Sequence, residues 1–233
     1  LGASTRKTGG GRLVLEALEA VVDVHTEIHV VGHSVGSILH APLVQLLATK
    51  GRIGAGPLKG ETGLGLPIKT CTLWAPACTL ELFKETYLPL IGSGIEQFTL
   101  FTLNDRTERE DNCARIYNKS LLYLVSNALE EEPRIPLFRD GVALLGMETF
   151  VGQDPVMKEL FRNRFAEWIL SPNSSTDRPE NHSTARHHGD FDNDRATIAA
   201  TLQRITGAET PATMFKAREN PSALRERRIL LQR

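Results

Sequence analysis

The stretch that decides the fold is Glu27-Ile28-His29-Val30-Val31-Gly32-His33-Ser34-Val35-Gly36. Its first five residues are a short β-branched run, which is typical of a buried parallel strand. The spacing Gly-x-Ser-x-Gly at 32–36 follows at once, and helical spacing of Ile38, Leu39 and later leucines extends to about residue 50. A serine on a sharp strand-to-helix turn has its hydroxyl at the carboxyl edge of the sheet. The stretch therefore predicts a parallel α/β fold in which Ser34 is a nucleophile.

The turn itself explains the two glycines. We expect no room for side chains at Gly32 and Gly36, two positions on either side of Ser34. The start of the following helix favours a developing oxyanion, so the backbone N–H of Val35 is the predicted oxyanion donor. A glycine-flanked serine that binds phosphate is the alternative, but no Gly-x-x-x-x-Gly-Lys pattern is present.

The rest of the chain alternates between strand and helix patterns. Such alternation predicts one domain over residues 1–210, with a mostly parallel sheet and helices on both faces. Residues 51–67, with six glycines and two prolines, predict a loop, and residues 211–233 predict a basic C-terminal tail. The expected strands are 27–31, 68–74, 96–103 and 142–147, and the expected helices are 12–25, 35–50, 80–88, 114–129, 155–170 and 195–205.

A serine nucleophile needs a histidine base and an acid that orients it. Asp105 follows the 96–103 strand, so its carboxylate is expected at the same sheet edge as Ser34, with Asp111 as the competing acid. His188 is the predicted base, preferred over His187 because Gly189 permits a tight loop beside it.

Composition limits the remaining possibilities. The chain of 233 residues has 27 basic and 28 acidic residues, so its net charge draws it neither to nucleic acid nor to an anionic membrane. Three cysteines without zinc spacing suggest a reducing, cytoplasmic location. No apolar run reaches the length of a membrane span. The aspartates at 190, 192 and 194 resemble the start of a calcium loop, but Arg195 and Thr201 occupy the glycine and glutamate positions, so neither metal nor cofactor is expected.

With these motifs in place, residues 12–207 resemble the C-terminal two-thirds of the α/β-hydrolase superfamily. The resemblance rests on 32–36, Leu-Trp-Ala-Pro-Ala at 73–77, Asn-Asp at 104–105 and His-Gly-Asp-Phe-Asp at 188–192. It implies a Ser34, Asp105, His188 triad that cleaves an ester, a thioester or an amide of a small-molecule or acyl substrate. The family's earlier strands and second oxyanion donor are missing, so the chain is expected to be N-terminally truncated.

Two other functions fit the same residues. One is a non-catalytic protein of this fold that uses the pocket for binding. The other is an acyltransferase that uses the same nucleophile. The sequence leaves the oligomeric state open.

Overall fold

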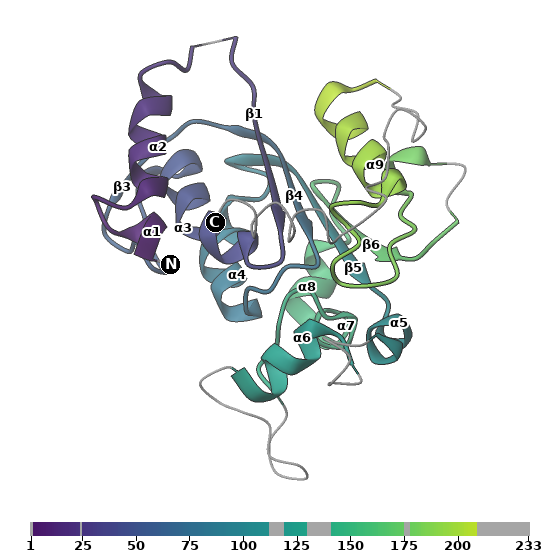
Figure 1. Ribbon diagram of the computed structural model, residues 1–233. Coiled ribbons are helices and arrows are strands. Elements are labelled where there is room, and N and C mark those ends of the chain that lie inside the picture. The colour runs from purple at the N-terminus through teal and green to yellow at the C-terminus, as the bar shows by residue number, and fades with distance from the viewer. Residues whose placement is uncertain (1, 24, 112–118, 130–140, 175–177, 209–233) are drawn as a thin grey trace, which may run out of the picture.

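A four-stranded parallel sheet forms the centre of the protein (Figure 1). The computed structural model describes residues 2–23, 25–111, 119–129, 141–174 and 178–208. The strand order is β1-β4-β5-β6, and all three neighbouring pairs are parallel. The fold is therefore α/β with a parallel sheet, as predicted. The strands are β1 (Ile28–His33), β4 (Ile68–Trp74), β5 (Ile95–Leu103) and β6 (Ala166–Ser171).

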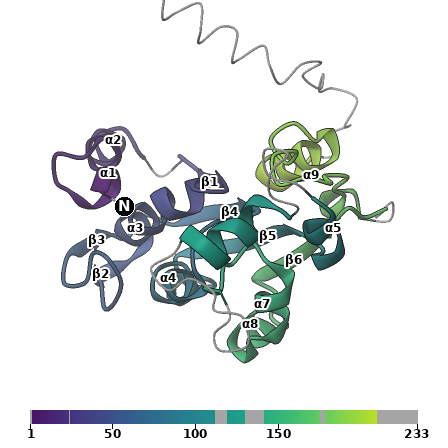
Figure 2. The same ribbon diagram turned by 60° about the horizontal axis from the view of Figure 1, so that its bottom comes forward.

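Helices cover both faces of this sheet (Figure 2). Helices α3 (Gly36–Ala48), α4 (Leu80–Thr86) and α8 (Pro155–Leu160) lie on one face, and α9 (Arg195–Thr206) lies on the other. Strand β5 shows the consequence, because Leu100 and Phe101 are both fully buried in different hydrophobic clusters. From Phe98 to Leu103 every residue of β5 is buried, as expected of a strand covered on both faces, although Thr99 and Thr102 interrupt the apolar residues.

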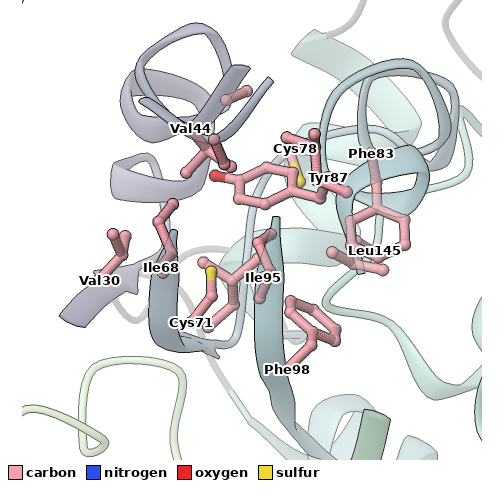
Figure 3. Packing of buried hydrophobic residues seen from close by; sticks show 14 of the residues in the cluster. Val30, Val44, Ile68, Cys71, Cys78, Phe83, Tyr87, Ile95, Phe98 and Leu145 are labelled. Atoms are coloured by element: carbon pink, nitrogen blue, oxygen red, sulfur yellow. The ribbon is translucent and has the colours of Figure 1, made fainter. Parts of the chain in front are cut away.

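The larger cluster packs the crossover helices onto the sheet. Figure 3 shows Tyr87 in this cluster, with its hydroxyl pointing towards helix α3. The hydroxyl donates a hydrogen bond of 2.7 Å to the carbonyl oxygen of Ser37, so its polar atom is satisfied although the side chain is fully buried. The bond joins the core to the first turn of the helix that follows Ser34.

The remaining elements are short and surround this centre. They are α1 (Gly2–Thr5), α2 (Gly10–Glu19), β2 (Lys50–Arg52), β3 (Thr62–Leu64), η1 (Leu88–Leu90), α5 (Asp105–Glu110), α6 (Leu121–Leu124), the π-helix η2 (Val125–Leu129), α7 (Glu148–Gln153) and η3 (Pro179–Asn181).

Two predicted elements are wrong. The predicted helix 155–170 ends at Leu160, and the strand β6 replaces its second half and pairs with β5. Short apolar runs fit either period, and pairing with a neighbouring strand decided this one. The predicted strand 142–147 is not a strand: Leu144 and Met147 each make only an isolated bridge.

Other boundaries also moved. The predicted loop 51–67 contains most of the antiparallel pair β2–β3, and the first helix ends at Glu19 instead of residue 25. The predicted helix 114–129 is described only from residue 119, as α6 and η2. The predicted basic tail lies outside the described residues. Within the described part of the chain, no helix has the length and apolarity needed to cross a membrane.

Candidate active site

Ser34 lies at the carboxyl end of β1, between the strand and α3. Its backbone has φ 53°, in the left-handed region that non-glycine residues seldom adopt. Residues held in this region cost about 1–3 kcal/mol each and persist only where the surroundings fix them. The turn predicted from the Gly-x-Ser-x-Gly spacing is thus present, and it is strained at the serine.

Hydrogen bonds on both sides of Ser34 hold this conformation. The carbonyl oxygen of Ser34 accepts from the backbone N–H of Ser37 at 3.1 Å, from the hydroxyl of Ser37 at 2.7 Å and from the N–H of Ala77 at 3.0 Å. The N–H of Ser34 donates to the carbonyl of Trp74 at 3.0 Å. The ends of β1 and β4 are therefore tied together at the serine, which offsets the strain.

The two flanking glycines differ in their surroundings. A Cβ on Gly32 would lie 3.0 Å from the ring of His40 and 3.1 Å from the side chain of Leu73, so the predicted lack of space is confirmed there. At Gly36 a Cβ would meet nothing within 4 Å, and the same prediction is wrong. Position 36 begins α3, where the Cβ points into open space.

The structure brings His188 to Ser34 across 154 residues of sequence. The Nε2 atom of His188 lies 2.8 Å from the hydroxyl oxygen of Ser34, and only 7% of the His188 residue is exposed. Burial lowers the pKa of His188 to about 4, with a smaller contribution from His33, while the charge of Asp111 raises it. The imidazole is therefore neutral at pH 7 and can accept the hydroxyl proton of Ser34.

The other ring nitrogen of His188, Nδ1, is not paired with any described residue. A neutral imidazole that accepts a proton at Nε2 carries its own proton on Nδ1. Nδ1 is buried and has no hydrogen-bond partner within the described residues. Within the described part of the chain, the orientation of this ring therefore depends on contacts other than a hydrogen bond at Nδ1.

Asp111 is the acid that lies against the histidine loop. One oxygen of its carboxylate accepts from the backbone N–H of His188 at 3.2 Å, and the other lies 2.7 Å from Nδ1 of His187. The side chain of Asp111 is only 6% exposed. It places a negative charge beside the base without touching the base's ring nitrogen.

Asp105 has partners other than the histidine loop. Its carboxylate accepts hydrogen bonds from the hydroxyls of Tyr123 at 2.6 Å and Thr149 at 2.8 Å, and it forms an ion pair of 2.7 Å with Arg109. Burial raises the pKa of Asp105, but these hydrogen bonds and the Arg109 charge outweigh it and hold the pKa below its usual value. The structure does not bring Asp105 to the ring of His188.

His187 is bonded to Asp111 and not to Ser34. Its side chain is 58% exposed, and the hydrogen bond with Asp111 raises its pKa. Gly189, which we expected to permit a tight loop, lies in a turn, but it has no positive φ and a Cβ there would meet nothing within 4 Å. The turn therefore does not depend on glycine at position 189, and hydrogen bonds from the backbone N–H groups of Arg186 and His187 to Asp190 stabilise it.

Val35 lies at the N-cap of α3 and is 64% exposed. The first N–H groups of a helix have no partner within the helix and carry a partial positive charge. The backbone N–H of Val35 is thus in a position suited to an anionic oxygen bound beside Ser34.

The aspartates of the calcium-like run have other partners. Asp190 accepts from the backbone N–H groups of Arg186 and His187, and Asp194 caps α9 by accepting from the N–H of Thr197. Over the described ranges, no three His, Cys, Asp or Glu side chains are grouped so as to hold a metal ion.

Sequence reasoning missed Ser37 and His33. Ser37 is fully buried; its hydroxyl donates to Ser34 and accepts from the N–H of Cys78 at 3.0 Å. A small polar residue three positions after the nucleophile was the available signal. His33 contacts the base loop, which no local pattern reveals.

A strained serine and a buried histidine thus meet at one edge of a parallel α/β sheet. Comparison of the chain with known protein families, with curated proteins and with solved structures found no significant match.

Proposed function

We propose that this protein is a serine hydrolase that cleaves carboxylic esters through an acyl-enzyme on Ser34. The observation that carries the proposal is the 2.8 Å contact between the hydroxyl of Ser34 and Nε2 of a buried His188. Nucleophile and base within hydrogen-bond reach are the signature of an activated serine. The φ of 53° supports it, because strain at the serine exposes its hydroxyl at the sheet edge.

The reaction divides into two steps. In the first, the oxygen of Ser34 attacks the ester carbonyl carbon while His188 accepts the hydroxyl proton at Nε2. The tetrahedral oxyanion is stabilised by the N–H of Val35, and the intermediate collapses as His188 protonates the departing alcohol. In the second, His188 takes a proton from water, which attacks the acyl-enzyme, and the carboxylic acid leaves as Ser34 regains its proton.

We assign the acid of this triad to Asp111 in place of the predicted Asp105. Protonation of His188 in the first step creates an imidazolium, which a nearby negative charge stabilises. Asp111 raises the pKa of His188 and binds its backbone N–H, whereas Asp105 is occupied by Tyr123 and Arg109. We also propose that the protein belongs to the α/β-hydrolase superfamily, because a serine, histidine and acid at the edge of a parallel sheet fit that superfamily.

Covalent labelling with a fluorophosphonate probe tests the nucleophile. The wild-type protein is expected to react at Ser34, and Ser34→Ala is expected to abolish the reaction. Ser93→Ala is the matched control, because Ser93 is an exposed serine preceding β5, at the opposite edge of the sheet. Equal labelling of the wild type and Ser34→Ala would refute the proposal.

The acid is tested by comparing Asp111→Asn with Asp105→Asn. Replacement of a triad acid costs up to about 10⁴-fold in turnover. We expect Asp111→Asn to slow ester cleavage by at least about 10²-fold, and Asp105→Asn to affect it far less. The reverse order would return the role to Asp105.

A further inference from the structure

His33 is the last residue of β1 and lies directly before the nucleophile, but its side chain reaches the base. Its Nε2 atom is 2.9 Å from the backbone carbonyl oxygen of His188. A carbonyl oxygen only accepts, so His33 donates this bond and carries a proton on Nε2. The two rings also lie close, with centroids 5.3 Å apart. Strand β1 thus contacts the base loop 155 residues further along the chain.

The peptide groups of His188 are held from two sides. Its N–H donates to Asp111, which ends α5 after β5, and its carbonyl accepts from His33 at the end of β1. One anchor ends β1 and the other follows β5 and α5, and β4 lies between β1 and β5 in the sheet. They fix the backbone of His188 between them above the sheet edge.

The ring of His188 depends on these anchors. In a serine triad the acid normally orients the imidazole by accepting from Nδ1. Here no side chain of the described residues forms a hydrogen bond with Nδ1. The position of Nε2, 2.8 Å from Ser34, therefore follows from where the backbone is held.

We propose that His33 is a positioning residue, which holds His188 over Ser34 by donating a hydrogen bond from Nε2 to the carbonyl of His188. The inference rests on the proposed function of Ser34 and His188. It assigns to His33 a role in aligning the base, separate from the proton transfer itself.

Two substitutions separate the donor from the ring. His33→Phe keeps an aromatic ring without a donor, and His33→Gln keeps an N–H donor at a similar reach without the ring. His25→Phe and His25→Gln are matched controls, since His25 is exposed in the turn before β1. Fluorophosphonate labelling rates are measured at the pH plateau for each variant, together with melting temperature and hydrogen exchange of the 186–192 backbone.

The expected result is a loss of about 10-fold or more in labelling rate for His33→Phe, because a tenfold change corresponds to one well-placed interaction. His33→Gln is expected to recover the rate to within about threefold of wild type. Hydrogen exchange of the 186–192 segment should rise in His33→Phe and stay near wild type in His33→Gln. The His25 variants should match the wild type in both measurements.

Two results would overturn the inference. One is a folded His33→Phe that labels and exchanges like the wild type. The other is a His33→Gln as slow as His33→Phe, which would transfer the role to ring packing. Failure of the proposed function is a separate outcome: the wild type would then label no faster than Ser34→Ala, and the exchange data would still decide whether His33 anchors the loop.

Discussion

The low pKa of His188 predicts the pH dependence of the nucleophile. A base is active in its neutral form, so the labelling rate should fall as pH drops through the pKa of the free enzyme's histidine. With a pKa of about 4, about 90% of the imidazole is neutral at pH 5, against about 3% for an ordinary histidine of pKa 6.5. The rate at pH 5 should thus stay close to its plateau, about 30-fold above the ordinary case.

The assay is the second-order rate constant for fluorophosphonate labelling between pH 2.5 and 8, with circular dichroism at each pH to show that the fold persists. Asp111→Asn adds a directional check: the negative charge of Asp111 raises the pKa of His188, so its removal should shift the midpoint lower still. A wild-type midpoint at or above 6.5 in folded protein would refute the assignment of a buried, desolvated base.

Three further predictions concern stability, each measured by urea unfolding. Burial raises the pKa of Glu108 to about 8, so the native state binds the proton of this carboxyl more tightly than the unfolded state does. The free energy of unfolding should therefore fall by up to about 5 kcal/mol as pH rises from about 4.5 to 8. Glu108→Gln should remove that fall. A pH-independent wild type would contradict this. Ser37→Ala leaves the N–H of Cys78 without its partner and should cost about 1–3 kcal/mol, whereas an unchanged midpoint would show that the bond contributes nothing. Gly32→Ala should destabilise by about 1–3 kcal/mol, because its Cβ would lie 3.0 and 3.1 Å from neighbouring side chains; unaltered stability would mean that those side chains move freely.

The parallel sheet was predictable because its first strands carry their own signals. β-branched runs, glycine-bounded turns and helical spacing between them lie within short windows of sequence. Strand β6 was not predictable in this way, since Trp168 and Ile169 continue a helical spacing from Met157. Its conformation depends on pairing with β5, which no local window contains.

In the candidate site, too, local sequence patterns predicted some residues, and contacts formed only in the folded chain decided the others. The Gly-x-Ser-x-Gly spacing indicated Ser34 from five residues, and chain order indicated His188 as a candidate base. The sequence favoured Asp105 over the competing Asp111, but both follow the same strand, six residues apart, and no local pattern separates their roles. Only the partners that fold around each carboxylate distinguish them, namely Tyr123 for Asp105 and the histidine loop for Asp111.

The position of β1 in the strand order has a consequence for how activity is lost on heating. Within the described sheet, the strand that bears Ser34 is bonded to a neighbour on one side only, β4, while β4 and β5 each have two. Outer strands detach at lower free energy than inner ones. Reversible fraying of β1 would carry the nucleophile away from His188 and remove Val30 from the larger hydrophobic cluster, while the smaller cluster, which contains no residue of β1, stays intact. Inactivation on heating can thus precede melting of the core.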